Sequence, residues 1–123
     1  MILFRNPKES CITLLLTCVC VFPSVYEPFG IVSLEAMAME KPVVVGARGV
    51  LGYKEQVISS GTDQNGMHVN GEVPADIAWG IKETLRNPER ARNWGENGRK
   101  RVLEYFTWRK VADETLKIYE SLL

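Results

Sequence analysis

The stretch TCVCVFPSVYEPFGIVSLEAMAMEKPVVVGARG, residues 17–49, decides the fold. Two short apolar runs, residues 17–22 and 42–45, lie on either side of a segment rich in helix formers, residues 31–40. The first run is predicted to be a buried strand, and Lys41-Pro42 ends the helix because a residue before proline avoids helical angles. A helix between two apolar strands indicates a right-handed βαβ unit in a parallel sheet, and therefore an α/β fold.

The second half of the chain is predicted to be mostly helical. It follows a glycine-rich turn that holds Gly46, Gly49 and Gly52. A brief strand is expected at residues 67–69, and apolar residues at helical spacing predict a helix from Pro74 to Arg86.

Two further helix starts carry clear capping signals. Asn87-Pro88-Glu89 combines an N-cap, a proline at the first helical position and an acid in the first turn. The helix that follows is expected to run to Tyr105, weakened by Gly95 and Gly98. Thr107 is expected to cap the last helix, whose apolar side chains recur every three or four residues: Trp108, Val111, Ala112, Thr115, Leu116, Tyr119 and Leu122.

Composition excludes several classes of protein. Fifteen Lys and Arg residues balance fifteen Asp and Glu residues, so a nucleic-acid binder that works by bulk positive charge is excluded. Hydrophobic residues make up 46% and charged residues 24% of the 123 residues, which is typical of folded domains rather than of disordered chains. A domain of this length buries roughly two-thirds of its unfolded surface.

The N-terminal apolar run leaves two interpretations open. Arg5 and Lys8 precede the run from Cys11 to Phe22, a pattern that mimics a signal peptide, although no small-residue cleavage site follows. The alternative is a buried strand preceded by a poorly ordered start. The run is too short to span a bilayer. The three cysteines, Cys11, Cys18 and Cys20, form neither a disulfide framework nor a zinc motif and are interpreted as small buried apolar residues.

The segment between the first strand and the first helix is a candidate anion site. The amides of Gly30, Ile31 and Val32 fall among the unpaired donors of a helix N-terminus, which favours a phosphate. Gly30 lets a ligand approach the backbone closely. Open α/β sheets bind ligands outside the carboxyl ends of their strands, where this segment is expected to lie.

Two carboxylates flank this predicted anion site. Glu27 precedes the helix and Glu35 lies within it. Because a carboxylate repels a phosphate, each is better suited to accept hydrogen bonds from hydroxyl groups. A diphosphate between two polyhydroxyl groups, as in a nucleotide sugar, fits that arrangement. Taken alone, the two acids are more simply interpreted as solvated side chains near the start of a helix, with no ligand.

The sequence resembles the retaining glycosyltransferases of the GT-B type, family 4, often called group 1. The resemblance rests on an E-x7-E signature, Glu27 to Glu35 within YEPFGIVSLEAMA, on the KPVVVGARG that follows, and on the C-terminal pattern, and it covers Thr17 to Leu123. It implies a partial Rossmann-like domain with a helical C-terminal region. It also implies that Glu27 contacts the donor sugar as catalytic residue, that Glu35 holds the ribose hydroxyls, and that the donor meets the backbone around Phe29, Gly30, Ile31 and Val32.

The resemblance further implies hexosyl transfer from a nucleotide diphosphate sugar, which is a co-substrate, with no metal or other cofactor required; the chain also lacks a D-x-D pair. The family's basic pair that grips the diphosphate lies upstream of the signature, where Arg5 and Lys8 stand in a stretch without family pattern. We therefore expect residues 1–16 to be an uncertain N-terminal segment and residues 17–123 to be part of the donor-binding domain.

This length predicts an incomplete enzyme, active only with a separately encoded N-terminal acceptor domain. The alternative is a non-catalytic remnant, a truncated product or split subunit that acts as a binding or partner-dependent module; a small exported protein is a third hypothesis. The expected location is the cytoplasm or the cytoplasmic face of a membrane, with no transmembrane segment and no nucleic-acid partner. The stripe on the last helix is expected to expose apolar surface.

The remaining notable side chains have structural interpretations. Arg48 could bind a phosphate from the glycine-rich turn, but an exposed charge is the simpler interpretation. His68 is interpreted as a structural or surface histidine rather than as a catalytic base. Lys54 and residues 99–101 resemble solvated helix faces. Three tryptophans are interpreted as core or interface anchors: Trp79, Trp94 and Trp108.

Overall fold

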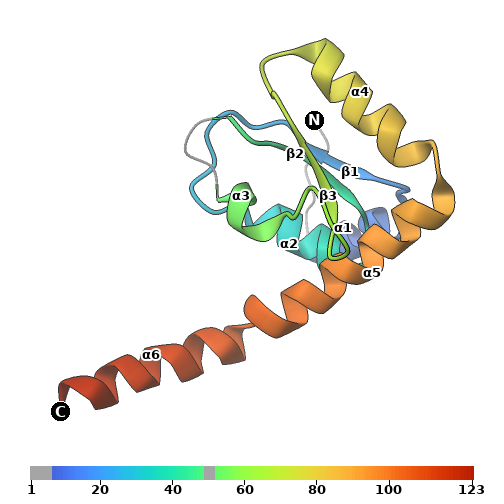
Figure 1. Cartoon of the computed structure of the whole chain (residues 1–123). Helices are drawn as coiled ribbons and strands as arrows, with labels where there is room; N and C mark the ends of the chain where they lie inside the picture. Colours follow the sequence, from blue (N-terminus) through green and yellow to red (C-terminus); the bar gives the residue numbers. More distant parts are fainter. Residues whose placement is uncertain (1–6, 49–51) are drawn as a thin grey trace.

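A computed structural model describes residues 7–48 and 52–123 (Figure 1). Within them, β1 (Cys20–Phe22), β2 (Val43–Gly46) and β3 (Gly66–Val69) form a parallel sheet in the order β1-β2-β3. Val44 of the central strand lies opposite Val21 on one side and Met67 on the other. The predicted parallel sheet and its strand-helix-strand unit are therefore confirmed.

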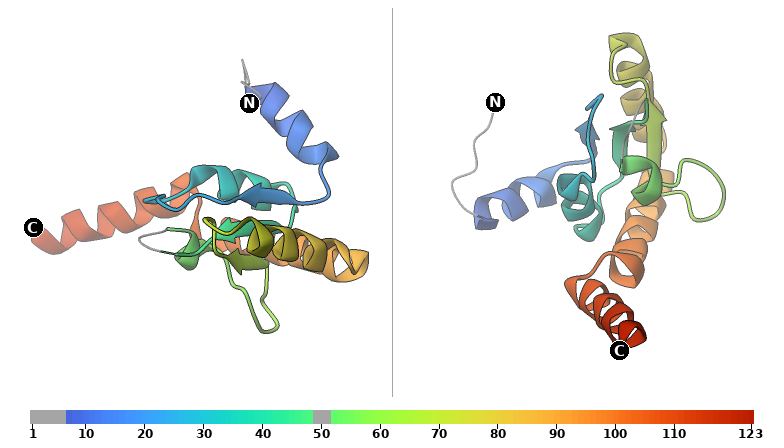
Figure 2. Two further views of the ribbon diagram at one scale, coloured as in Figure 1. Left: turned by 90° about the horizontal axis from the view of Figure 1, so that it is seen from above. Right: turned by 90° about the vertical axis from the view of Figure 1, so that its left-hand side faces the viewer.

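Helices cover both faces of this sheet, with α2 and α4 on opposite sides (Figure 2). The predicted helices after the first strand, before Asn87, and after Asn87 and Thr107 all form, within two residues of their expected bounds. Helices α1 and α3 were not predicted. The helices of the described residues are α1 (Pro7–Leu16), α2 (Ile31–Ala38), α3 (Tyr53–Gln56), α4 (Pro74–Leu85), α5 (Pro88–Tyr105) and α6 (Trp108–Leu122).

The central strand β2 is buried on both faces. Val43 and Val45 belong to a core shared with α2 and α3, whereas Val44 belongs to a second core with Met67 and Trp94. All three valines are fully buried. This double burial explains why the strand is a continuous apolar run rather than an alternating one.

Helix α5 joins the two cores along one end of the sheet (Figure 1). Trp94 packs in the α4 core and Val102 in the α2 core. The predicted weakening by Gly95 and Gly98 does not interrupt the helix, because both glycines lie in a tight packing contact. A Cβ at Gly95 would overlap the Glu40 carbonyl, and one at Gly98 would lie 3.1 Å from Met37 Cγ.

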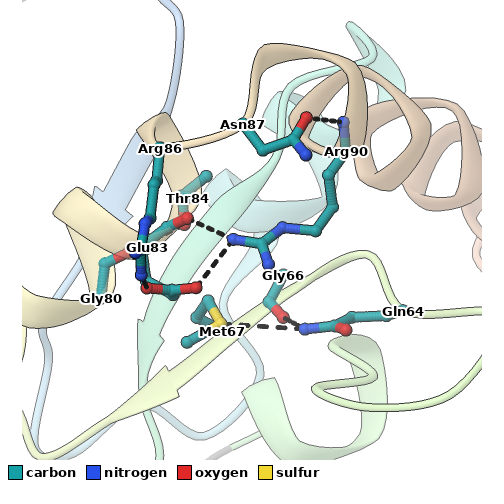
Figure 3. Close-up of polar contacts among 9 residues, drawn as sticks. All are labelled: Gln64, Gly66, Met67, Gly80, Glu83, Thr84, Arg86, Asn87 and Arg90. Atoms are coloured by element: carbon teal, nitrogen blue, oxygen red, sulfur yellow. Dashed lines mark hydrogen bonds and ion pairs between the residues drawn. The ribbon is translucent and has the colours of Figure 1, made fainter.

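The corner between α4 and α5 is held by polar contacts (Figure 3). Asn87 caps α5 as predicted, its side chain accepting a hydrogen bond from the Arg90 amide at 3.0 Å. The Arg90 guanidinium in turn donates to the Glu83 carboxylate at 3.0 Å and to the Glu83 carbonyl oxygen. The pKa of the Glu83 carboxyl is lowered, chiefly by its hydrogen bond from Arg90. One arginine therefore fixes the end of α4 against the start of α5.

The N-terminal apolar run divides into a helix and a strand, so the predicted strand over residues 17–22 is too long. Helix α1 ends at Leu16, and the Thr17 amide and hydroxyl both donate to the Leu14 carbonyl, which turns the chain. Pairing with β2 begins only at Cys20, whose amide donates to the Pro42 carbonyl at 3.1 Å. Among the described residues, no helix has both the length and the apolar content that crossing a membrane requires.

The two cysteines next to this turn differ in environment. Cys20 is buried, and burial raises the pKa of its thiol. Cys18 is exposed, which corrects its interpretation as a buried apolar residue. It lies in the turn before β1, outside the strand that would have buried it.

Helix α6 extends away from the sheet (Figures 1 and 2). Thr107 caps it as predicted, accepting a hydrogen bond from the Lys110 amide at 3.2 Å. The apolar stripe is formed as well, but no residue of α6 is buried, and Trp108 is 84% exposed. Of the three tryptophans interpreted as anchors, Trp94 is a core residue, while Trp79 and Trp108 are exposed in this chain.

Candidate functional site

The candidate site begins at the carboxyl end of the edge strand β1, where the chain turns into α2. Gly30 is the N-cap of α2 and has φ +82°, a left-handed conformation that glycine adopts without strain. The first helical hydrogen bond runs from the Ser33 amide to the Gly30 carbonyl at 3.2 Å. The amides that precede Ser33 in this first turn have no acceptor within the helix, as expected of a helix N-terminus.

The open face of α2 carries three of the predicted site residues. Ile31, Val32 and Glu35 are exposed, while the opposite face is buried. Residues three and four positions apart share one side of a helix, so the Glu35 carboxylate extends from the same side as the first turn. The buried face consists of Ser33, Leu34, Ala36 and Met37.

A short helix, α3, lies directly beneath the loop that contains Glu27. The Gly52 amide donates to the Glu27 carbonyl at 2.9 Å, and a Cβ on Gly52 would overlap the backbone of Phe29. The next residue, Tyr53, is 1% exposed, and its ring lies where a Cβ of Gly30 would be. Glycine is therefore required at two positions for α3 and the loop to approach each other.

The pKa of the buried Tyr53 phenol depends on its burial and on two residues of the loop. Burial raises the pKa of its phenol, and the negative charge of Glu27 raises that pKa further. A hydrogen bond with Ser24, from the start of the same loop, acts in the opposite direction. The raised pKa keeps the Tyr53 phenol neutral beside the loop that contains Glu27.

The side chain of Phe29 points to a different part of the molecule. Its ring packs edge-on against Phe106, with ring centroids 6.3 Å apart, and the Arg101 guanidinium lies over the Phe106 ring at 5.7 Å. Phe29 remains 45% exposed. The loop is therefore held by the end of α5 as well as by α3.

The residues with structural interpretations mostly lie away from this loop. Arg48 is exposed and forms an ion pair with Glu72 at 3.5 Å. His68 is half-buried on β3, and burial lowers the pKa of its imidazole, with the Lys54 charge lowering it further. Its Nε2 atom is buried without a hydrogen-bond partner among the described residues. A hydrogen bond with the Val57 backbone acts on the pKa in the opposite direction, and this contact agrees with a structural histidine.

Some predictions fall outside what the structure describes. Arg5, near the start of the chain, and Gly49, part of the glycine-rich turn, lie outside the described residues, as does the side chain of Cys11, which was interpreted as buried. The prediction that residues 99–101 form a solvated helix face is incomplete, because Arg101 is only partly exposed. Its guanidinium donates to the Gln56 carbonyl at 2.9 Å and to the Glu55 carbonyl at 2.6 Å.

Sequence reasoning missed the residues that support the loop: Tyr53, Gln56 and Arg101. One signal was available, since Ser33 places a hydroxyl among apolar neighbours on the buried face of α2. A buried polar group needs a partner, and here the partner is the Gln56 side chain.

A parallel sheet with helices on both faces, and a glycine-initiated helix after one strand, define a Rossmann-like α/β domain. A family model described as glycosyl transferases group 1 matches residues 1–101. The chain belongs to this family, which is the one that its E-x7-E signature resembles. The matched range includes residues 1–16 and ends before α6.

Individual relatives agree with this assignment. An uncharacterized glycosyltransferase of Methanocaldococcus jannaschii is 41% identical over 108 residues, which cover 83% of this chain and 25% of that protein. An alpha-maltose-1-phosphate synthase of Mycolicibacterium smegmatis is 37% identical over 85% of this chain and 27% of its own length.

A solved structure supports the fold. The sucrose-phosphate synthase of Thermosynechococcus elongatus superposes with a TM-score of 0.79 at 37% identity, over 90% of this chain and 27% of that one. The chain therefore has the fold of part of a GT-B glycosyltransferase. The chain spans about a quarter of the length of the relatives it matches.

Proposed function

We propose that this chain is the donor-binding portion of a retaining glycosyltransferase that uses a nucleotide diphosphate sugar. One observation carries the proposal: the family's signature is folded so that Gly30 opens α2 and Glu35 lies on the same open side as the first-turn amides. A diphosphate would accept hydrogen bonds from the amides of Gly30, Ile31 and Val32, favoured by the positive end of the helix.

The two carboxylates would recognise the sugars at either end of the diphosphate. Glu35 would accept hydrogen bonds from the ribose hydroxyls, and Glu27 would contact the transferred sugar. Their separation along the chain, one before α2 and one within it, matches a ligand whose negative charge lies between two polyhydroxyl groups. Each carboxylate would then face hydroxyl donors rather than the phosphates that repel it.

The chemical task of this half-site would be to stabilise the departing diphosphate. Breaking the sugar–phosphate bond places negative charge on the leaving group while the sugar acquires oxocarbenium character. Amides that are already oriented toward that charge lower the barrier without reorganising. We propose that no metal ion is needed for this step, because the helix N-terminus supplies part of the required positive potential.

An acceptor-binding domain is not among the elements described, and the chain spans only about a quarter of its relatives. We therefore propose that residues 17–123 form part of the donor domain, after an N-terminal segment of residues 1–16, and that transfer requires an acceptor domain from another part of the protein or another chain. The cytoplasm, or its membrane face, is the location where nucleotide sugars would be available to it.

A second candidate function is a non-catalytic binding module. It is favoured by the exposed apolar stripe of α6, which suits a subunit whose role depends on a partner. The two proposals differ in whether transfer occurs once an acceptor domain is supplied, whereas both predict binding of the donor.

Calorimetric titration with a panel of nucleotide diphosphate sugars tests donor binding. We expect one member of the panel to bind, and Glu35→Gln to weaken that binding roughly tenfold or more, since it loses a charge-assisted hydrogen bond. Glu120→Gln, an exposed acid on α6, is the matched control and should bind as the unsubstituted chain does. Absence of binding across the panel, or an equal effect of both substitutions, would contradict the proposal.

A further inference from the structure

Gln56 is the buried polar residue that touches the candidate site from below. It is fully buried at the end of α3, and its side chain faces the loop before α2. The carboxamide nitrogen donates to the Phe29 carbonyl, and the carboxamide oxygen accepts from the Ser33 hydroxyl. Each half of the carboxamide therefore has a partner in the loop or in the first turn of α2.

The Ser33 hydroxyl extends this connection to a second carbonyl. It lies 2.8 Å from the Gly30 carbonyl oxygen while it also contacts the Gln56 carboxamide oxygen. A hydroxyl has one proton, so that proton is shared between the two acceptors. Gln56 thus holds the Phe29 carbonyl toward the interior, while the Gly30 carbonyl accepts from both the amide and the hydroxyl of Ser33 and is directed into the first turn of α2.

Holding a carbonyl also orients the amide of the following residue. The peptide unit is planar and trans, so its N–H points away from its C=O. The Phe29 carbonyl shares its peptide unit with the Gly30 amide, and the Gly30 carbonyl shares one with the Ile31 amide. The inward Phe29 carbonyl therefore places the Gly30 N–H outward. The Gly30 carbonyl, held in the first turn of α2 by Ser33, leaves the Ile31 N–H at the open end of the helix, where the proposed diphosphate would bind.

The position of Gln56 is itself fixed from α5 and from the loop after α3. Helix α3 has only four residues, too few to be stable without tertiary contacts. Arg101 donates to the Gln56 carbonyl at 2.9 Å, and the Asn65 side chain donates to the same oxygen at 3.3 Å. These bonds anchor the backbone that carries the carboxamide.

We propose that Gln56 is a positioning residue of the donor site, which aims the Gly30 and Ile31 amides at the diphosphate through its contacts with Phe29 and Ser33. The inference rests on the proposed function for the identity of the ligand. The orientation of the two amides is a property of the unliganded chain and can be measured by itself.

Gln56→Met tests the inference, because methionine has nearly the same length but neither donates nor accepts as the carboxamide does. The control is Thr84→Val, which removes one buried hydrogen bond, from Thr84 to the Gly80 carbonyl, on the far side of the sheet. Each variant is titrated with UDP, GDP and ADP and with the matching nucleosides. The nitrogen-15 order parameters of the Gly30 and Ile31 amides are measured without ligand.

We expect Gln56→Met to weaken diphosphate binding about tenfold, which corresponds to one lost interaction, and nucleoside binding less than about twofold. The two amide order parameters should fall from about 0.85 toward about 0.6. Thr84→Val should change neither quantity. A folded Gln56→Met chain with unchanged diphosphate affinity and unchanged order parameters would overturn the inference.

Ser33→Ala keeps the experiment decisive if Gln56→Met does not fold. It removes the contact of the Gln56 carboxamide with Ser33 and leaves its contact with the Phe29 carbonyl. We therefore expect a smaller loss of diphosphate affinity, about threefold, together with greater motion of the Ile31 amide. No change in either would overturn the inference. If the unsubstituted chain binds none of the three diphosphates, the proposed function fails, whereas the order parameters still decide whether Gln56 orients the loop.

Discussion

Replacing Gly30 by alanine tests the close approach of α3 to the loop. Two costs add at this position. Alanine at φ +82° costs about 1 kcal/mol because its Cβ crowds the backbone. The same Cβ would overlap the buried Tyr53 ring, and overpacking of this kind costs about 1–3 kcal/mol. We expect Gly30→Ala to lower the free energy of unfolding by about 2–4 kcal/mol.

Gly61→Ala is a matched control within the same chain. Gly61 has φ +86°, but a Cβ there would have nothing within 4 Å. Only the backbone cost applies, so its free energy of unfolding should fall by about 1 kcal/mol. The difference between the two variants isolates the overlap with Tyr53.

Urea unfolding measures both free energies, with the fluorescence of Trp94 as the probe, since this tryptophan of α5 is 5% exposed and belongs to the core that contains Val44 and Met67. Circular dichroism checks that the helical signal is lost in the same transition. Equal destabilisation by the two substitutions would show that Tyr53 does not pack against Gly30.

Three further predictions concern the rest of the fold. Because burial lowers the pKa of His68, the unfolded chain binds a proton more strongly than the folded chain. The free energy of unfolding should therefore fall as the pH drops from about 7.5 to about 5.5. Urea titrations of His68→Gln at these two pH values should show a smaller difference in that free energy than titrations of the unsubstituted chain. Asn87→Ala should lower the free energy of unfolding by about 1 kcal/mol through the lost cap of α5, and Asn87→Ser should restore most of it in the same titration. Removal of residues 108–123 should change the unfolding midpoint little, since no residue of α6 is buried, and a large shift by calorimetry would contradict that description.

Local sequence signals were sufficient for most of the elements. The apolar run of β2 identified a strand, and Asn87-Pro88 identified the start of α5 because capping chemistry is local. The N-terminal run was interpreted as a signal peptide or a buried strand, and its helical first part was not predicted, because a short apolar segment fits a helix or a strand equally well. There the boundary depends on where β2 offers a partner, which only the tertiary structure determines.

The candidate site was predictable in part. The signature from Glu27 to Glu35 located the loop and the helix, but the predicted roles of its residues remain predictions. The support beneath it was not predictable, because α3 is one turn long and Arg101 lies 45 residues from the Gln56 carbonyl that it contacts. Arg101 lies in a helix segment whose sequence is typical of a solvated face, and nothing in that sequence indicates a hydrogen bond to a distant carbonyl.

Nuclear magnetic resonance titration of the chain with the nucleotide diphosphate sugar that binds best would locate the donor site. We expect the amide resonances of Gly30, Ile31 and Val32 to shift most, together with the side-chain resonances of Glu27 and Glu35. The same titration of Glu35→Gln should require a higher ligand concentration to reach the same shifts. Shifts that centre on another part of the fold, or no shifts at saturating ligand, would contradict the assignment of the donor site to this loop.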